Sequence, residues 1–217
     1  MVVVGGDAVP GPFCREVLSR LEAVRIPVRM LRGNGEREVA AAVGADAPAD
    51  DDLAALTAAR TAAELGEERA LALGALPPTV QCDDVLYCHA TPRRDDEMLT
   101  RISPPERWAA ALAGVTAPLV VGGHTHLADD RRVGAVRFLN AGSVGLPYEG
   151  DGAARWLWVE DGIPEKRATA YDAAAAGERM LAAGWPDERS LRAALIDPVD
   201  PFEVTRIFEG IARAQAG

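Results

Sequence analysis

Apolar residues in the first third of the chain follow a strand, helix, strand pattern. Residues 1–4 are a short β-branched run that ends in two glycines, which predicts a buried strand leading into a loop. Residues 13–24 place apolar side chains at helical spacing, and residues 27–31 form a second apolar run. Residues 51–73, rich in Ala, Leu and Glu, predict one or two further helices. We therefore expect a β-α-β unit followed by helices.

The middle of the chain continues this alternation and then changes to strands alone. Residues 85–88 and 119–121 are apolar runs that predict buried strands, with a helix at 105–113 between them. Such alternation is typical of layered α/β folds. Three later strand candidates, separated by turns that contain Gly and Asp, predict a run of antiparallel strands. They cover residues 136–139, 155–159 and 166–171.

The end of the chain predicts helices that Pro-containing segments interrupt at residues 185–186 and 198–201. No segment has the composition of a linker. We therefore expect one domain over residues 1–217, with the strands and motifs in residues 1–172 and a helical segment in residues 173–217.

Composition narrows the class of protein. With 48% hydrophobic and 26% charged residues the chain is globular, and a net charge of −10 with scattered arginines argues against a nucleic-acid scaffold. No apolar run reaches the roughly 18 residues of a membrane span, and no secretory signal is visible, so we expect a cytoplasmic protein without membrane partners. Cys14, Cys82 and Cys88 are an odd, widely spaced set, which predicts free thiols.

All three histidines come directly after predicted strands, where α/β proteins build their sites. His89 follows residues 85–88, and His124 and His126 follow residues 119–121 and two glycines. On extended backbone, the i, i+2 spacing would point both imidazoles of the pair to one side. By itself such a pair also fits two surface histidines.

Two other strand ends supply oxygen ligands, at Gly6-Asp7 and Gly33-Asn34. Each alone is an ordinary turn or helix cap. In chain order, however, these two, Cys88-His89, the segment 123–126 and the segment 140–145 (Asn-Ala-Gly-Ser-Val-Gly) resemble the motif series of the calcineurin-like metallophosphoesterases. The likeness is greatest to their small bacterial phosphodiesterase and protein-phosphatase-like branch, and it covers roughly residues 1–172.

The resemblance implies a four-layer α/β/β/α sandwich of two mixed β-sheets flanked by helices, and a site for two divalent metal ions. Asp7 would bridge both ions, Asn34, His89 and His124 would complete one of them, and His126 would belong to the other. Asp7, Asn34 and His89 would be the catalytic residues. This ligand set suits Mn²⁺, Fe, Ni²⁺ or Zn²⁺. The implied reaction is hydrolysis of a phosphodiester or phosphomonoester in a small phosphorylated substrate, by a metal-activated water.

One motif of the family, Asp-x-His on an N-terminal strand, is not found, and only six residues precede Asp7. We expect the strand and helix that carry it to be missing, which leaves an apolar edge at residues 1–4 open to homo-oligomer formation. Asp7 and His126 alone would hold the second ion weakly, so one well-occupied metal is predicted. The alternative is a catalytically impaired homologue that binds a nucleotide or a protein partner.

The remaining candidates have structural interpretations beside the functional ones. Cys88 points away from the His89 side of its strand and is predicted to be a core thiol. Trp156 and Trp158 share one face of a strand and are predicted to lie in the core. Ser143 lacks the partners of a nucleophile, and its segment is predicted to be structural. Arg93 follows the His89 loop and is a candidate contact for a substrate phosphate, although a solvated arginine is the simpler expectation.

Overall fold

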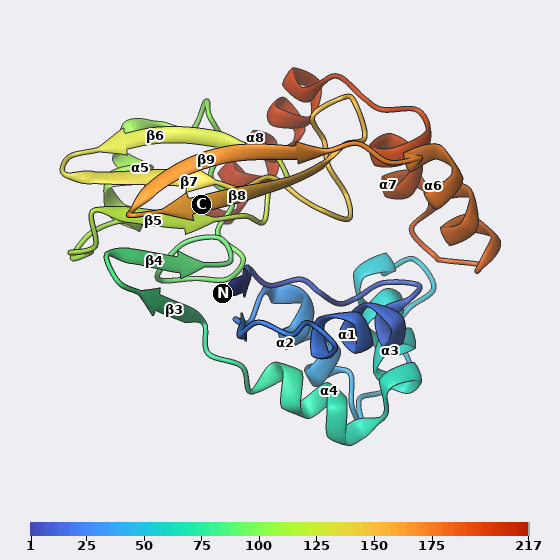
Figure 1. Cartoon of the computed structure of the whole chain (residues 1–217). Helices are drawn as coiled ribbons and strands as arrows, with labels where there is room; N and C mark the ends of the chain where they lie inside the picture. Colours follow the sequence, from blue (N-terminus) through green and yellow to red (C-terminus); the bar gives the residue numbers. More distant parts are fainter. Residues whose placement is uncertain (217) are drawn as a thin grey trace.

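The computed structural model describes residues 1–216, which contain three β-sheets and the helices that connect and flank them (Figure 1). The strands are β1 (Val2–Val4), β2 (Val28–Met30), β3 (Thr79–Cys82), β4 (Val85–Cys88), β5 (Leu119–Gly122), β6 (Asp129–Val133), β7 (Val136–Asn140), β8 (Ala154–Glu160) and β9 (Ile163–Thr169). The helices are α1 (Cys14–Glu22), α2 (Asn34–Ala41), α3 (Leu53–Leu65), α4 (Glu67–Gly74), α5 (Pro105–Ala111), α6 (Ala173–Ala182), α7 (Glu188–Leu191), the π-helix η1 (Arg192–Ile196) and α8 (Pro201–Ala216).

The N-terminal part is the predicted β-α-β unit. Strands β1 and β2 pair in parallel, with Val2 opposite Val28, and α1 makes the connection. Helices α1 to α4 share an apolar core with the loop after β1. The long helical stretch forms two helices because Gly66 takes φ +83°, which ends α3. The carboxyl ends of β1 and β2 therefore lie side by side.

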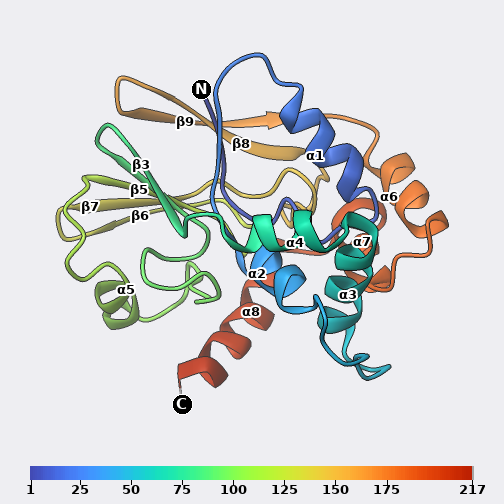
Figure 2. The ribbon, with the colours of Figure 1, turned by 90° about the horizontal axis from the view of Figure 1, so that it is seen from below.

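The five-stranded sheet has the order β3-β4-β5-β7-β6 and is mixed. Strands β4, β5 and β7 are parallel to one another, and the outer strands β3 and β6 are antiparallel to their neighbours. One face packs against Trp108 and Ala111 of α5. Figure 2 shows α5 and the β8–β9 hairpin on opposite sides of this sheet. The mixed α/β fold is thus confirmed, and the four-layer order stays a prediction.

The β8–β9 hairpin covers the second face of the sheet and corrects one expectation. Leu157 and Val159 pack against the sheet residues Val121 and Leu139 among others. The alternate side chains, Trp156 and Trp158, are 37% and 49% exposed, so their predicted place in the core is wrong.

Four other features differ from the sequence-based expectations. Helix α2 and strands β3 and β6 were not predicted, since each is short or rich in charged residues. Strand β7 pairs in parallel with β5, so the later strands do not form one antiparallel run. They form two antiparallel pairs instead, β6–β7 and β8–β9.

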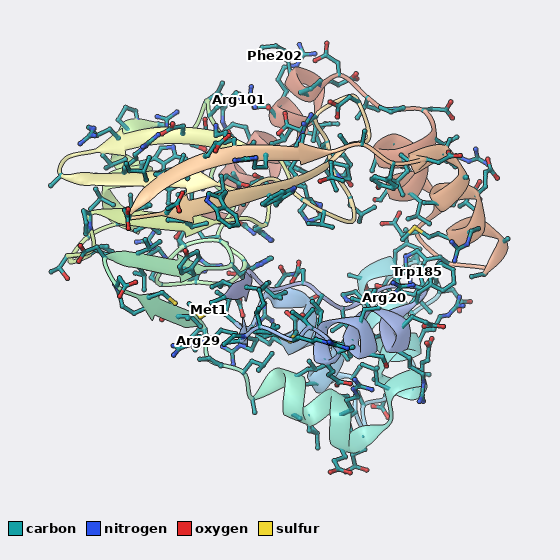
Figure 3. All side chains as sticks on the ribbon, in the orientation of Figure 1. Met1, Arg20, Arg29, Arg101, Trp185 and Phe202 are labelled. Carbon is teal, nitrogen blue, oxygen red and sulfur yellow. The ribbon has the colours of Figure 1, made fainter. Side chains whose placement is uncertain are left out.

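The C-terminal helices form a separate apolar cluster around Leu191 and Leu195 and contact the N-terminal helices. Arg60 of α3 donates to the carbonyl groups of Ala183 and Gly184, and its guanidinium lies 5.5 Å from the ring centroid of Trp185. Figure 3 labels Trp185, beside the N-terminal helices, and Phe202, at the start of α8. Among residues 1–216, no helix has both the length and the apolar character needed to cross a membrane.

Candidate metal centre

Asp7 lies just beyond β1, where the chain passes through Gly5 and Gly6. Its backbone has φ +54°, a left-handed conformation that costs a residue with a Cβ about 1–2 kcal/mol and that collects at functional sites. The N–H of Gly35 donates to Asp7 Oδ1 over 2.8 Å. The other oxygen, Oδ2, lies 3.1 Å from His89 Nε2.

Asn34 is the first residue of α2, shortly after the end of β2 in the chain. Its amide nitrogen donates to Glu38 Oε1 over 3.3 Å. Its amide oxygen is buried and has no hydrogen-bond partner within residues 1–216. Because an unsatisfied buried acceptor costs free energy, this oxygen suits a ligand, and a cation would satisfy it.

His89 follows β4 and is 3% exposed. Its Nδ1 lies 2.8 Å from the carbonyl oxygen of Gly5, which places a ring proton on Nδ1 and makes Nε2, the nitrogen that faces Asp7, the one that could bind a cation. Nε2 lies 3.2 Å from His124 Nδ1. The contact with Gly5 thus fixes the tautomer and the ring orientation, as a neighbouring acceptor does for histidine ligands of metals.

His124 and His126 lie in a loop after β5 whose backbone is not extended, contrary to the sequence-based expectation. Both residues are left-handed, with φ +66° and +56°. Buried Asn140 holds this loop by donating from Nδ2 to Gly123 O over 2.6 Å and to Thr125 Oγ1 over 2.9 Å. The hydrogen bonds of one buried amide therefore stabilise the strained loop.

His126 faces a different set of neighbours from His124. Its Nδ1 lies 3.0 Å from the carbonyl oxygen of Leu146, and its ring stacks on Tyr148 at a centroid distance of 5.7 Å. Tyr148 in turn packs edge-to-face on Phe208 of α8. The C-terminal helices thus support the position of His126.

Asp7, His89 and His124 form one cluster, with a ligand atom from each lying within 4.8 Å of the others. They come from the ends of β1, β4 and β5, so two separate sheets contribute. His126 is not a member of this cluster. One carboxylate and two imidazoles at this separation can hold a divalent cation.

Burial and charge shift the pKa values of the cluster. Burial alone would raise the pKa of Asp7, but His89 and the N–H of Gly35 outweigh it and hold the pKa below its ordinary value. Burial would lower the pKa of His89, and the Asp7 carboxylate reverses this and raises it. Burial, with His89 beside it, lowers the pKa of His124 to about 4, and burial lowers that of His126 as well. Both are neutral at pH 7, the form that binds metals.

The comparison with protein families shows which family the chain belongs to. Residues 1–160 match the sequence model of the calcineurin-like phosphoesterase superfamily domain. The chain belongs to the calcineurin-like phosphoesterase superfamily. Members of this superfamily bind divalent metals, which agrees with the ligand types of the cluster.

Two solved structures share the fold of this chain. A hypothetical protein from Pyrococcus horikoshii has a TM-score of 0.72 and 18% sequence identity, over 89% of this chain and 83% of its own. A metallophosphoesterase from Sphaerobacter thermophilus has a TM-score of 0.70 and 22% identity, over 90% of this chain and 87% of its own. No curated protein matches the chain significantly.

Three candidates outside the cluster have structural partners within the chain. Arg93 pairs with Glu97 and donates to Ala110 O over 3.0 Å, so its predicted contact with a substrate phosphate stays a prediction. Ser143 Oγ accepts the N–H of Leu146 over 3.1 Å, which agrees with a structural role. Cys88 is 1% exposed and is the predicted core thiol.

Sequence reasoning missed Glu36, which lies within the site and is completely buried. The pattern Gly33-x-x-Glu36 is a signal that could have found it. A glutamate three residues after a helix N-cap commonly accepts the N-cap N–H, and here Gly33 N donates to Glu36 Oε2 over 2.8 Å.

Proposed function

We propose that the chain hydrolyses a phosphate ester with the help of a divalent cation held by Asp7, His89, His124 and Asn34. The observation that carries this proposal is the convergence of three ligand atoms within 4.8 Å at the ends of strands from two sheets. The unpartnered, buried oxygen of Asn34 supports the assignment of a fourth ligand. Family membership supports phosphoesters as the substrate class.

The donor set fits such a cation chemically. A carboxylate, an amide oxygen and neutral imidazoles suit Mn²⁺, Fe, Ni²⁺ or Zn²⁺, and Asp7 is the ligand whose charge two ions could share. When bound, the cation would polarise the phosphoryl group and increase the acidity of a water molecule. With only Asp7 and His126 assigned to a second position, we expect one ion to bind well and a second to bind weakly.

The residues of the chain contribute orientation and charge. Gly5 fixes the tautomer of His89 so that Nε2 faces the cluster, and Gly35 holds one oxygen of Asp7 so that the other faces His89. Such preorganisation lowers the reorganisation that the reaction requires. A small phosphorylated substrate in the cytoplasm remains our proposal for the partner and the location.

The direct test is hydrolysis of bis-p-nitrophenyl phosphate by purified protein in the presence of added Mn²⁺. Turnover should require the metal and should fall to background in His124→Ala. A matched control is Asp187→Asn, which changes a capping residue of α7 outside the cluster. Metal binding without turnover on any phosphoester would instead support the alternative, a catalytically impaired homologue that binds a nucleotide or a protein partner.

A further inference from the structure

Glu36 has an unusual environment for a carboxylate. Its side chain is 0% exposed, and its two oxygens accept four backbone N–H groups. Oε2 accepts from Asp7 and Gly33, each over 2.8 Å. Oε1 accepts from Ala8 over 2.8 Å and from Val9 over 3.3 Å. Burying a carboxylate without such donors would be strongly unfavourable, so these four bonds are what keep it in place.

The four donors come from two chain segments that are far apart in sequence. Asp7, Ala8 and Val9 belong to the loop after β1, whereas Gly33 is the N-cap of α2. A glutamate that served only to cap α2 would need the Gly33 N–H alone. The three additional bonds join the loop that carries Asp7 to the helix that carries Asn34.

We propose that Glu36 is a positioning residue for the metal centre, an inference that rests on the proposed function. By holding the N–H of Asp7, it stabilises the left-handed backbone that turns the Asp7 carboxylate toward His89. By holding Gly33, it sets the start of α2, from which the N–H of Gly35 reaches Asp7 Oδ1 and which carries the buried Oδ1 of Asn34. Glu36 itself contacts neither substrate nor cation.

The close approach of the two segments supports this role. A Cβ added to Gly6 would lie 2.7 Å from Gly33 N and 2.7 Å from His89 Nδ1. The backbones of the loop after β1 and of the start of α2 thus pack directly against each other and against the ring of His89. A small separation of the two segments would therefore move several ligands together.

The variant Glu36→Gln tests the inference with nearly unchanged shape. Each carboxylate oxygen accepts two N–H groups, so in either orientation the glutamine NH₂ faces two donors that have lost their acceptor. The matched control is Glu209→Gln, which removes another buried carboxylate, one that accepts from Thr100 and Ser103 and is not in the cluster.

The readout is the Mn²⁺ dissociation constant, measured by calorimetry on protein that circular dichroism shows to be folded. Glu36→Gln should bind Mn²⁺ about 10- to 100-fold more weakly than wild type, and Glu209→Gln should bind it equally well. Equal binding by Glu36→Gln and wild type would overturn the inference. If wild type itself binds no Mn²⁺, the proposed function fails instead.

A second measurement needs neither a variant nor a metal. In the metal-free wild type, amide hydrogen exchange at Asp7, Ala8 and Gly33 should be slow, although none of these N–H groups belongs to a strand ladder. In Glu36→Gln the same amides should exchange faster while those of α3 are unchanged. Unprotected amides in wild type would contradict the role given to Glu36.

Discussion

Substitution of Gly33 by alanine is the sharpest perturbation of the centre that the packing suggests. Gly33 has φ −93° and ψ −177°, a conformation that alanine adopts without strain, so the effect is steric. A Cβ at this position would lie 2.8 Å from Asp7 N and 2.9 Å from His89 Nδ1, and nearer still to Asp7 Oδ1. Ordinary contact begins at 3.4 Å, so Asp7 and His89 must each move by roughly 0.5 Å or more, comparable to the tolerance of catalytic groups.

A misplacement approaching 1 Å costs about 10²-fold in rate, or about 2.7 kcal/mol of transition-state stabilisation. We therefore expect kcat/KM for Mn²⁺-dependent hydrolysis of bis-p-nitrophenyl phosphate to fall by about 10²-fold in Gly33→Ala. The matched control is Gly11→Ala, because a Cβ at Gly11 meets nothing within 4 Å and its φ is not left-handed. Wild-type kinetics in a folded Gly33→Ala protein would refute the proposed geometry of the centre.

Three further predictions concern groups around the centre and in the core. Asn140→Ala removes the hydrogen bonds that hold the histidine loop and should lower the free energy of unfolding by about 1–3 kcal/mol in urea titrations; an unchanged midpoint would contradict this. Burial would raise the pKa of Glu209, but Ser103, Thr100 and Arg107 hold it below 4.5. The free energy of unfolding of wild type should therefore exceed that of Glu209→Gln by a constant amount above pH 4.5, and this difference should decrease as the pH falls further. A difference that grows in acid would argue against this. Burial raises the pKa of Cys14 to about 11 and that of Cys88 to about 12, so a thiol reagent should label only Cys82 in the folded protein. Rapid labelling of all three cysteines would show that Cys14 and Cys88 are not buried.

The convergence of Asp7, His89 and His124 could be predicted because each follows an apolar strand. The strand ends of an α/β fold are where sites are built, and the chain order of the motifs indicated that these ends belong together, although β1 lies in a different sheet from β4 and β5. Their roles as metal ligands, and those of Asn34 and His126, stay predictions. The backbone of the histidine loop could not be predicted, since its left-handed residues depend on Asn140, which comes later in the chain.

The wrong placement of Trp156 and Trp158 has a simple cause. Alternation along a strand shows which side chains share a face, but it does not say which face is covered. Leu157 and Val159 formed an equally regular apolar set, and these are the residues that pack on the sheet. The size of the tryptophans favoured the core in the prediction, whereas in the structure the face that carries Leu157 and Val159 is the one that packs on the sheet.

The role of Glu36 illustrates a limit of local patterns. Its position three residues after Gly33 predicts a helix start, and α2 does begin there. Its bonds to Asp7 and Ala8 span 29 and 28 residues and depend on the parallel pairing of β1 with β2. No short-range pattern encodes such contacts.

The most direct test of the central claim is the position of a bound metal in crystals grown with Mn²⁺, located by anomalous diffraction at the manganese edge. The account predicts a peak within coordination distance of Asp7, His89 and His124, with Asn34 as a further ligand. A peak elsewhere, or no peak at this cluster in crystals saturated with Mn²⁺, would contradict it.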